Sequence, residues 1–188
     1  MDMEFNLKKD ELKVPALVLA IFLLGFSVVY LSNGPRLSDP DAYFQYRMAQ
    51  YVLEEGRVPE IYTLAYYPEG RRPWIQDTLV LPYFFAYTYK ILGALLGLSL
   101  MEYAMVFPAI FGGGLASVFL GLAASELFGR RMGLLSALIY SFLPLSLSRV
   151  YSGTIDKEVL YGFFAYLSLY LFVKSYKNGF SIKNPKTL

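Results

Sequence analysis

The sequence contains no cysteine and no histidine among its 188 residues. Without cysteine, the chain can form neither a disulfide framework nor a thiolate metal site. Without histidine, it lacks the commonest metal ligand and a side chain that often serves as a general base. Any metal ion bound by this chain must therefore be held by oxygen ligands.

Charge is also sparse. Only 17% of the residues are charged, and the net charge of +2 gives no argument for binding nucleic acid. Hydrophobic residues make up 56% of the chain, which exceeds the roughly 45–50% of soluble domains. The composition therefore predicts a membrane protein.

Four largely apolar stretches approach the length that a helix needs to cross a bilayer: residues 14–31, 103–124, 132–148 and about 158–175. The last has an uncharged run of only 15 residues, 159–173, so it must extend over its charged flanks. A signal peptide is an alternative for the first stretch, although no small-residue cleavage site follows it. The second stretch has small residues at every fourth position, Gly113, Ser117 and Gly121, which predicts close packing against another helix. The sequence thus predicts an all-α membrane protein with four transmembrane helices.

The segments between these stretches differ in charge. Lys and Arg gather in the N-terminal tail, in the link 125–131 and in the C-terminal tail, and such segments stay cytoplasmic. Four crossings then place residues 32–102 and 149–157 outside. The apolar stretch 79–98 would break this pattern if it crossed. We therefore expect it to lie in the membrane interface or against the other helices.

The external stretch 32–102 far exceeds ordinary connections of about 4–6 residues, so it should be structured or functional. It begins with Asp39 and Pro40, a favoured helix cap and a favoured first helical residue. An apolar periodicity then continues to Gly56 and places Asp41 on the buried face of the helix. Asp39 is interpreted as a cap and Asp41 as a candidate ligand.

A second acidic pair, Asp156 and Glu158, opens the last apolar stretch on the same predicted side as Asp41. Carboxylates at membrane depth are costly unless they are paired or bind a cation, and they favour hard ions such as Mg²⁺ or Mn²⁺. An alternative is helix capping by Asp156, with Glu158 in the first turn. Residues i and i+2 of a helix do not share a face, so the pair can hold one ion only where the segment is not helical.

Three tracts carry a resemblance to a known family. DAYFQYRMAQYV at 41–52 and SRVYSGTIDKE at 148–158 resemble its two acidic motifs, and YYPEGRRP at 66–73 resembles its Tyr-Pro-x-Gly-Arg tract. Their order and spacing are similar to those in the N-terminal part of the catalytic subunit of archaeal and eukaryotic oligosaccharyltransferase. The resemblance runs from about Leu37 to Phe180, and it gives no role to Arg71 of the middle tract.

The resemblance implies the N-terminal portion of a C-type glycosyltransferase fold with a long helical first external loop. The implied reaction transfers an oligosaccharide from a dolichyl phosphate or diphosphate donor to Asn in an Asn-x-Ser/Thr acceptor polypeptide. Asp41 carries over as a catalytic metal ligand that contacts the acceptor amide. Asp156 and Glu158 carry over as further ligands of Mg²⁺ or Mn²⁺. The implied place is the cell membrane of an archaeon, with the active site facing the extracytoplasmic side.

Arg149 lies close to the second acidic pair in the sequence. It is a candidate for holding the donor phosphate or the acceptor, and the alternative is an interfacial arginine that reaches the membrane surface. Two other functions also stay open. One is a related protein mannosyltransferase that uses lipid-phosphate sugars, and the other is a non-catalytic membrane scaffold or transporter piece whose acids cap helices.

Catalytic subunits of this family are several times longer. They carry a later external loop with another catalytic acid and a soluble C-terminal domain with a Trp-Trp-Asp-Tyr-Gly motif that reads the acceptor. This chain has one Trp. We therefore expect an N-terminal fragment of the membrane domain, without the C-terminal domain.

The isolated chain is expected not to glycosylate an acceptor peptide, because acceptor selection and part of the metal site would lie outside it. The assay combines the purified chain with lipid-linked oligosaccharide, Mn²⁺ and an Asn-x-Thr peptide. Transfer by this chain alone would contradict the interpretation as a fragment.

Overall fold

A computed structural model describes residues 2–32, 36–37 and 40–178. These residues form helices and loops without a β-strand, and one isolated backbone bridge pairs Tyr62 with Arg71. The elements in chain order are α1 (Asp2–Tyr30), α2 (Pro40–Glu55), α3 (Pro73–Gln76), α4 (Val80–Thr88), the π-helix η1 (Tyr89–Gly93), α5 (Ala94–Leu96), α6 (Leu100–Pro108), the π-helix η2 (Ala109–Leu115), α7 (Ala116–Phe128), α8 (Arg130–Phe142), α9 (Pro144–Leu147) and α10 (Lys157–Lys177).

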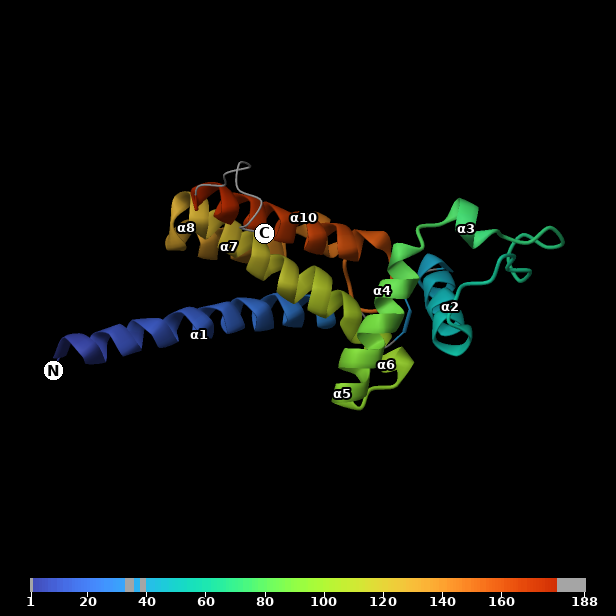
Figure 1. Ribbon diagram of the computed structural model, residues 1–188, viewed down its shortest axis with the longest axis horizontal. Coiled ribbons are helices and arrows are strands. Elements are labelled where there is room, and N and C mark those ends of the chain that lie inside the picture. Colours follow the sequence, from blue (N-terminus) through green and yellow to red (C-terminus); the bar gives the residue numbers. More distant parts are fainter. Residues whose placement is uncertain (1, 33–35, 38–39, 179–188) are drawn as a thin grey trace, which may run out of the picture.

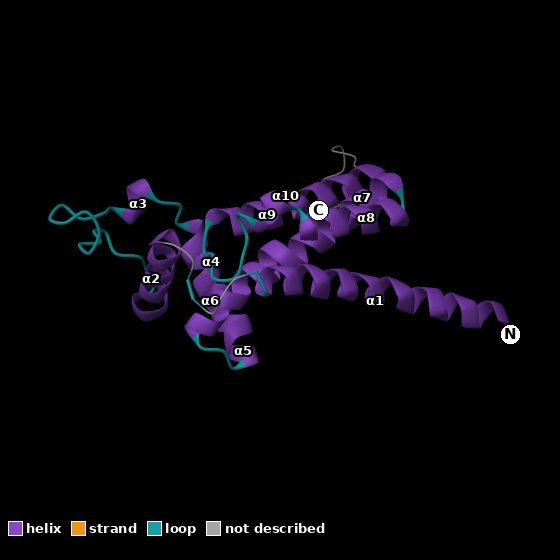
Figure 2. Ribbon diagram, turned by 180° about the vertical axis from the view of Figure 1, so that it is seen from behind, coloured by secondary structure: helices purple, strands orange, loops and turns teal. Residues whose placement is uncertain are grey.

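The long helices run in one direction. Figure 1 shows α7, α8 and α10 side by side, with α1 below them and in contact with η2 through its later turns. The start of α1, the α7–α8 link and the end of α10 lie toward one end of the molecule. The helices α2 and α3 and the loop before α10 lie at the other end, as Figure 2 shows from behind. The described parts of the three segments predicted to be cytoplasmic therefore share one end.

Two helical segments are long and apolar enough to cross a membrane: Leu100–Phe128, which joins α6, η2 and α7, and Lys157–Lys177. The apolar segments Pro15–Tyr30 and Val80–Leu96 are shorter. The prediction of an all-helical chain is confirmed for the described residues. The prediction of four crossings stays a prediction.

The helix predicted over 132–148 is not continuous. It ends at Phe142, and a separate turn, α9, begins at Pro144. Leu143 between them has ψ 118°, in the extended region. The Pro144 ring disfavours the helical conformation of the residue before it, so the helix breaks here.

The helix predicted to begin at residue 103 begins at Leu100. Its cap is Ser99, whose hydroxyl accepts a hydrogen bond from the Glu102 backbone N–H at 3.3 Å. The Glu102 carboxylate accepts one from the Ser99 backbone N–H at 2.8 Å, which completes a capping box. This Ser-x-x-Glu signal stands in the sequence, but charge counting excluded Glu102 from the predicted span.

The predicted small-residue seam brings two helices close to the η2–α7 segment. A Cβ atom added to Gly25 of α1 would lie 2.6 Å from the Gly113 carbonyl oxygen, and Gly121 similarly faces Gly133 of α8. Between them, the buried Ser117 hydroxyl donates to the Gly113 carbonyl at 2.6 Å. The prediction of a packing role is confirmed. The small residues let backbones approach within a distance that larger side chains would prevent.

The stretch 79–98 packs on the other helices through aromatic rings and runs across their direction (Figure 1). Phe85 of α4 lies edge-on to Phe107 with ring centroids 5.0 Å apart, and Phe84 meets Phe111 at 5.0 Å. Phe111 in turn meets Phe163 of α10 at 5.4 Å. Such edge-to-face pairs add to the burial of the rings, and they fix α4 against the end of the bundle that carries the acidic motifs.

Gly25→Ala is expected to lower the free energy of unfolding by about 1–3 kcal/mol, because overpacking forces backbone shifts. The new methyl group would meet both the Gly113 carbonyl and the Ser117 hydroxyl at 2.6 Å. Thermal unfolding in detergent, followed by circular dichroism, measures the change. Ala20→Val, on an exposed position of the same helix, is the matched control. Equal melting temperatures for the two variants would contradict the close contact.

Candidate functional site

Asp156 is the N-cap of α10, with extended φ and ψ of −134° and 163°. Its carboxylate accepts a hydrogen bond from the Lys157 backbone N–H at 2.6 Å. Glu158 lies in the first helical turn. The sequence allowed a shared ion only where this segment leaves the helical conformation, and Asp156 meets that condition. Capping and ion binding are therefore compatible here.

The acidic pair is held by buried neighbours on both sides. Ile155 and Val159 are fully buried, whereas Asp156 and Glu158 are half-buried. The Glu158 Oε2 atom is buried and has no hydrogen-bond partner among the described residues. A buried carboxylate oxygen without a donor is costly, so this atom indicates a place where a cation or a donor would stabilise the site.

Burial and the neighbouring Glu158 carboxylate raise the pKa of Asp156 above its ordinary value, and its bond to the Lys157 backbone opposes them. The folded state therefore holds this proton more tightly than the unfolded state does. Stability from this group is fully present below the ordinary pKa and is lost as the pH rises through the raised pKa. Above the raised pKa, the ionised Asp156 carboxylate destabilises the fold unless a positive charge compensates it.

The loop before α10 is tied to the end of α1. The Ser152 backbone N–H donates to the Val29 carbonyl at 3.2 Å, and the Ser152 hydroxyl donates to the Met105 carbonyl at 3.1 Å. Gly153 has φ +83° and lies against the Arg36 carbonyl, where a Cβ atom would collide. The second acidic motif thus sits where the chain leaves α1 and turns toward α2, the helix of the first motif.

Asp41 lies in the first turn of α2 and is exposed. The prediction that it lies on the buried face was wrong, because that face is centred on Ala42, Ala49 and Met48. Phe44 and Tyr51 of the same helix are only partly buried, whereas Ala42 and Ala49 are fully buried. Asp39 and its interpretation as a cap lie outside the described residues.

The described part of the chain contains no group of three or more acidic side chains that could hold a metal ion. Asp156 and Glu158 are adjacent, and Asp41 is not gathered with them. Arg149 is exposed in the turn that follows α9. The structure therefore brings together two of the four residues singled out from the sequence. The others lie toward the same end of the molecule.

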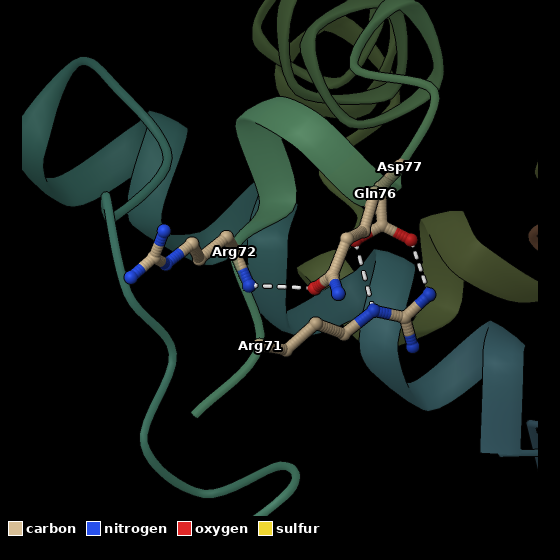
Figure 3. A network of polar contacts seen from close by, with 4 residues as sticks. All are labelled: Arg71, Arg72, Gln76 and Asp77. Atoms are coloured by element: carbon tan, nitrogen blue, oxygen red, sulfur yellow. Dashed lines mark hydrogen bonds and ion pairs between the residues drawn. The ribbon is translucent and has the colours of Figure 1, made fainter. Parts of the chain in front are cut away.

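No role for Arg71 follows from the sequence alone. Its guanidinium makes two bonds to the Asp77 carboxylate, Nε to Oδ2 at 2.9 Å and Nη2 to Oδ1 (Figure 3). It also lies 4.2 Å from the ring centroid of Phe44 on α2. Backbone bonds of 2.7 and 3.0 Å between Arg71 and Tyr62 close the loop. Arg71 therefore fastens the loop between α2 and α4 to the helix that carries Asp41.

Comparison with known proteins identifies the family of the chain. Residues 16–184 match the family model described as "Oligosaccharyl transferase STT3, N-terminal". The chain belongs to this family. The match favours the oligosaccharyltransferase resemblance over the mannosyltransferase alternative, and it covers both acidic motifs and the loop of Arg71.

Three curated relatives are archaeal proteins named dolichyl-phosphooligosaccharide-protein glycotransferase 1. The chain is 31% identical to the one from Pyrococcus furiosus over 86% of its own length and 16% of the relative's. It is 28% identical to the one from Pyrococcus horikoshii over 74% and 14%, and 26% identical to the one from Archaeoglobus fulgidus over 84% and 27%. The chain thus spans 14–27% of the length of these relatives.

Arg71→Ala is expected to cost about 2 kcal/mol of local stability, between the values for surface and buried ion pairs. The reason is that the Asp77 side chain, 7% exposed, would lose its partner. Amide hydrogen exchange over residues 62–77 should become roughly 30-fold faster. Arg72→Ala, an exposed neighbour, is the control and should leave exchange unchanged. If both variants exchange alike, the ion pair does not hold the loop.

Proposed function

We propose that this chain is the N-terminal part of the membrane domain of an archaeal oligosaccharyltransferase. The complete enzyme would transfer an oligosaccharide from a dolichyl phosphate or diphosphate donor to the Asn of an Asn-x-Ser/Thr acceptor polypeptide. The observation that carries the proposal is the half-buried pair Asp156 and Glu158, held beside the end of α1 within a chain of this family.

The pair would hold Mg²⁺ or Mn²⁺. Its donor set of carboxylate oxygens suits a hard cation, and the buried, unpartnered Glu158 Oε2 atom supplies a ligand in need of positive charge. Two carboxylates leave most of the coordination sphere open. We propose that Asp41, at the start of α2, completes the protein ligands in the whole enzyme.

A divalent cation bound there would neutralise the leaving phosphate oxygens of the donor. The chain's own residues would do the positioning. The exposed Asp41 carboxylate accepts from the acceptor amide N–H and orients a poor nucleophile toward the donor. Arg149, exposed beside the loop of the acidic pair, donates to the donor phosphate or the acceptor.

For the membrane, we propose four crossings by α1, α6–η2–α7, α8 with α9, and α10. Support comes from the charge distribution. The N-terminal tail, the α7–α8 link and the C-terminal tail carry most of the Lys and Arg outside the loop 32–102, and their described parts lie at one end of the bundle, with the acidic motifs at the other. The transverse segment α4–α5, with its exposed Tyr87 and Ile91, would lie at the extracytoplasmic interface. The active site would face the same side.

The test uses a chimaera in which this chain replaces the matching segment of the Pyrococcus furiosus relative. Asp156→Asn and Asp41→Asn should each lower glycan transfer at least 100-fold, because asparagine still caps a helix but is a poor anionic ligand. Transfer is measured with an Asn-x-Thr peptide over a range of Mn²⁺ concentrations.

Glu126→Gln is the matched control, because Glu126 lies at the other end of the bundle and pairs with Lys177 at 3.2 Å. It should transfer glycan at the rate of the parent chimaera. Unchanged transfer and unchanged Mn²⁺ dependence in Asp156→Asn would instead support the scaffold alternative.

A further inference from the structure

An open pocket of about 450 Å³ lies in the loop between α2 and α4. Its volume falls within the roughly 300–1,000 Å³ of ligand sites. The lining residues are polar or aromatic: Tyr66, Glu69, Gly70, Arg71 and Gln76. Neither acidic motif contributes to it, so the proposed transfer chemistry leaves this pocket without a role.

The charge of the pocket argues against an anionic ligand. Arg71 is the cation in the lining, and its charge is compensated by the two bonds to Asp77. Glu69 adds a carboxylate to the wall, and among the described residues no ion pair to this carboxylate is found. A phosphate would be repelled by this carboxylate, and the guanidinium charge that could attract it is already compensated by Asp77, so the pocket suits a neutral polar molecule.

The pocket offers fixed donors and an acceptor. The Arg71 Nη1 amino group takes part in neither bond to Asp77, so its N–H groups remain as donors that the ion pair holds in place. The Gln76 Oε1 atom accepts from the Arg72 backbone N–H at 2.8 Å (Figure 3), which orients the side-chain amide group. With the Glu69 carboxylate as acceptor, this set matches neighbouring hydroxyl groups, each of which both donates and accepts.

Tyr66 adds an aromatic face at the pocket. Its φ of +57° lies in the left-handed region that non-glycine residues rarely adopt, and such strain persists where the surroundings hold it and function uses it. The ring is 68% exposed, and the Arg71 guanidinium lies 5.9 Å from its centroid. An exposed ring of this kind packs well against the C–H face of a sugar, since the ring face is negative and the C–H groups are weakly positive.

We propose that this pocket binds a neutral saccharide, namely sugar units of the donor oligosaccharide. The identity of that saccharide rests on the proposed function, whereas the binding itself does not require transfer. Arg71 connects the two sites, because the same guanidinium that lines the pocket stacks on Phe44, one helical turn from Asp41. A glycan held here would extend from a donor bound beside the first acidic motif.

The experiment measures saturation-transfer NMR of mannotriose, chitotriose and maltotriose with the full chain in lipid nanodiscs. At least one of these neutral probes should bind. Tyr66→Asn removes the ring while tolerating the left-handed backbone, and it should weaken binding about tenfold. Glu69→Gln, at an exposed position, should weaken binding by a similar factor through loss of a charge-assisted bond.

Tyr67→Asn and Arg72→Ala are the matched controls, since both residues are exposed neighbours outside the lining. They should bind within twofold of the parent chain. Absence of binding of all three probes to the parent chain, or equal binding by Tyr66→Asn and Tyr67→Asn, would overturn the proposal. Displacement of the saccharide by inorganic phosphate would overturn it as well.

The two proposals fail separately. If the parent chain binds saccharide and the Asp156→Asn chimaera keeps full transfer, only the proposed metal chemistry is contradicted. Loss of transfer in that chimaera, together with no saccharide binding by this chain, would sink the pocket alone.

Discussion

The arrangement of the molecule depends on the ties that Ser152 makes to α1 and α6. Two hydrogen bonds, to the carbonyls of Val29 and Met105, hold the loop before α10 against the end of one helix and the flank of another. Gly153 then lets the loop approach the Arg36 carbonyl more closely than any other residue could. Segments far apart in the sequence meet at this point, and these contacts determine where the acidic pair lies.

The site is built at the expense of local stability. Nonpolar residues on both sides of the acidic pair are fully buried, so the carboxylates cannot turn away into water without moving the core. The raised pKa of Asp156 reports that constraint. Functional sites commonly retain such unfavourable groups, and the surrounding packing compensates for them. The loop of Arg71 differs, because there the charges of Arg71 and Asp77 compensate each other and the ion pair holds the polar lining of the pocket in place.

The sequence predicted the features that have a local or periodic signal. Helix α2 begins at Pro40 and ends before Gly56 as expected, and the capping role of Asp156 follows from its residue type. The predicted burial of Asp41 was wrong, because the buried face of α2 includes two alanines, whose contribution is hard to recognise from the pattern of large apolar residues. The bond between Arg71 and Asp77 could not be predicted, because it forms across an irregular loop where no periodicity relates the two positions. The small-residue seam of 113–121 was predicted to pack closely against another helix, but the sequence does not identify α1 and α8 as the helices that pack there.

The three successive glycines of η2 have a consequence for how this segment can vary. Gly112 lies against Val150 of the loop before α10, whereas Gly113 and Gly114 lie against Gly25 and Phe22 of α1, so two partners enclose this part of η2. The three glycines make these contacts through their backbone atoms, which have no side chain that a substitution could trim. Substitutions that keep this packing are therefore confined to the residues that face the glycines, and they must preserve the distance to the glycine backbone. The three glycines thus set the distance between η2 and the segments packed against it.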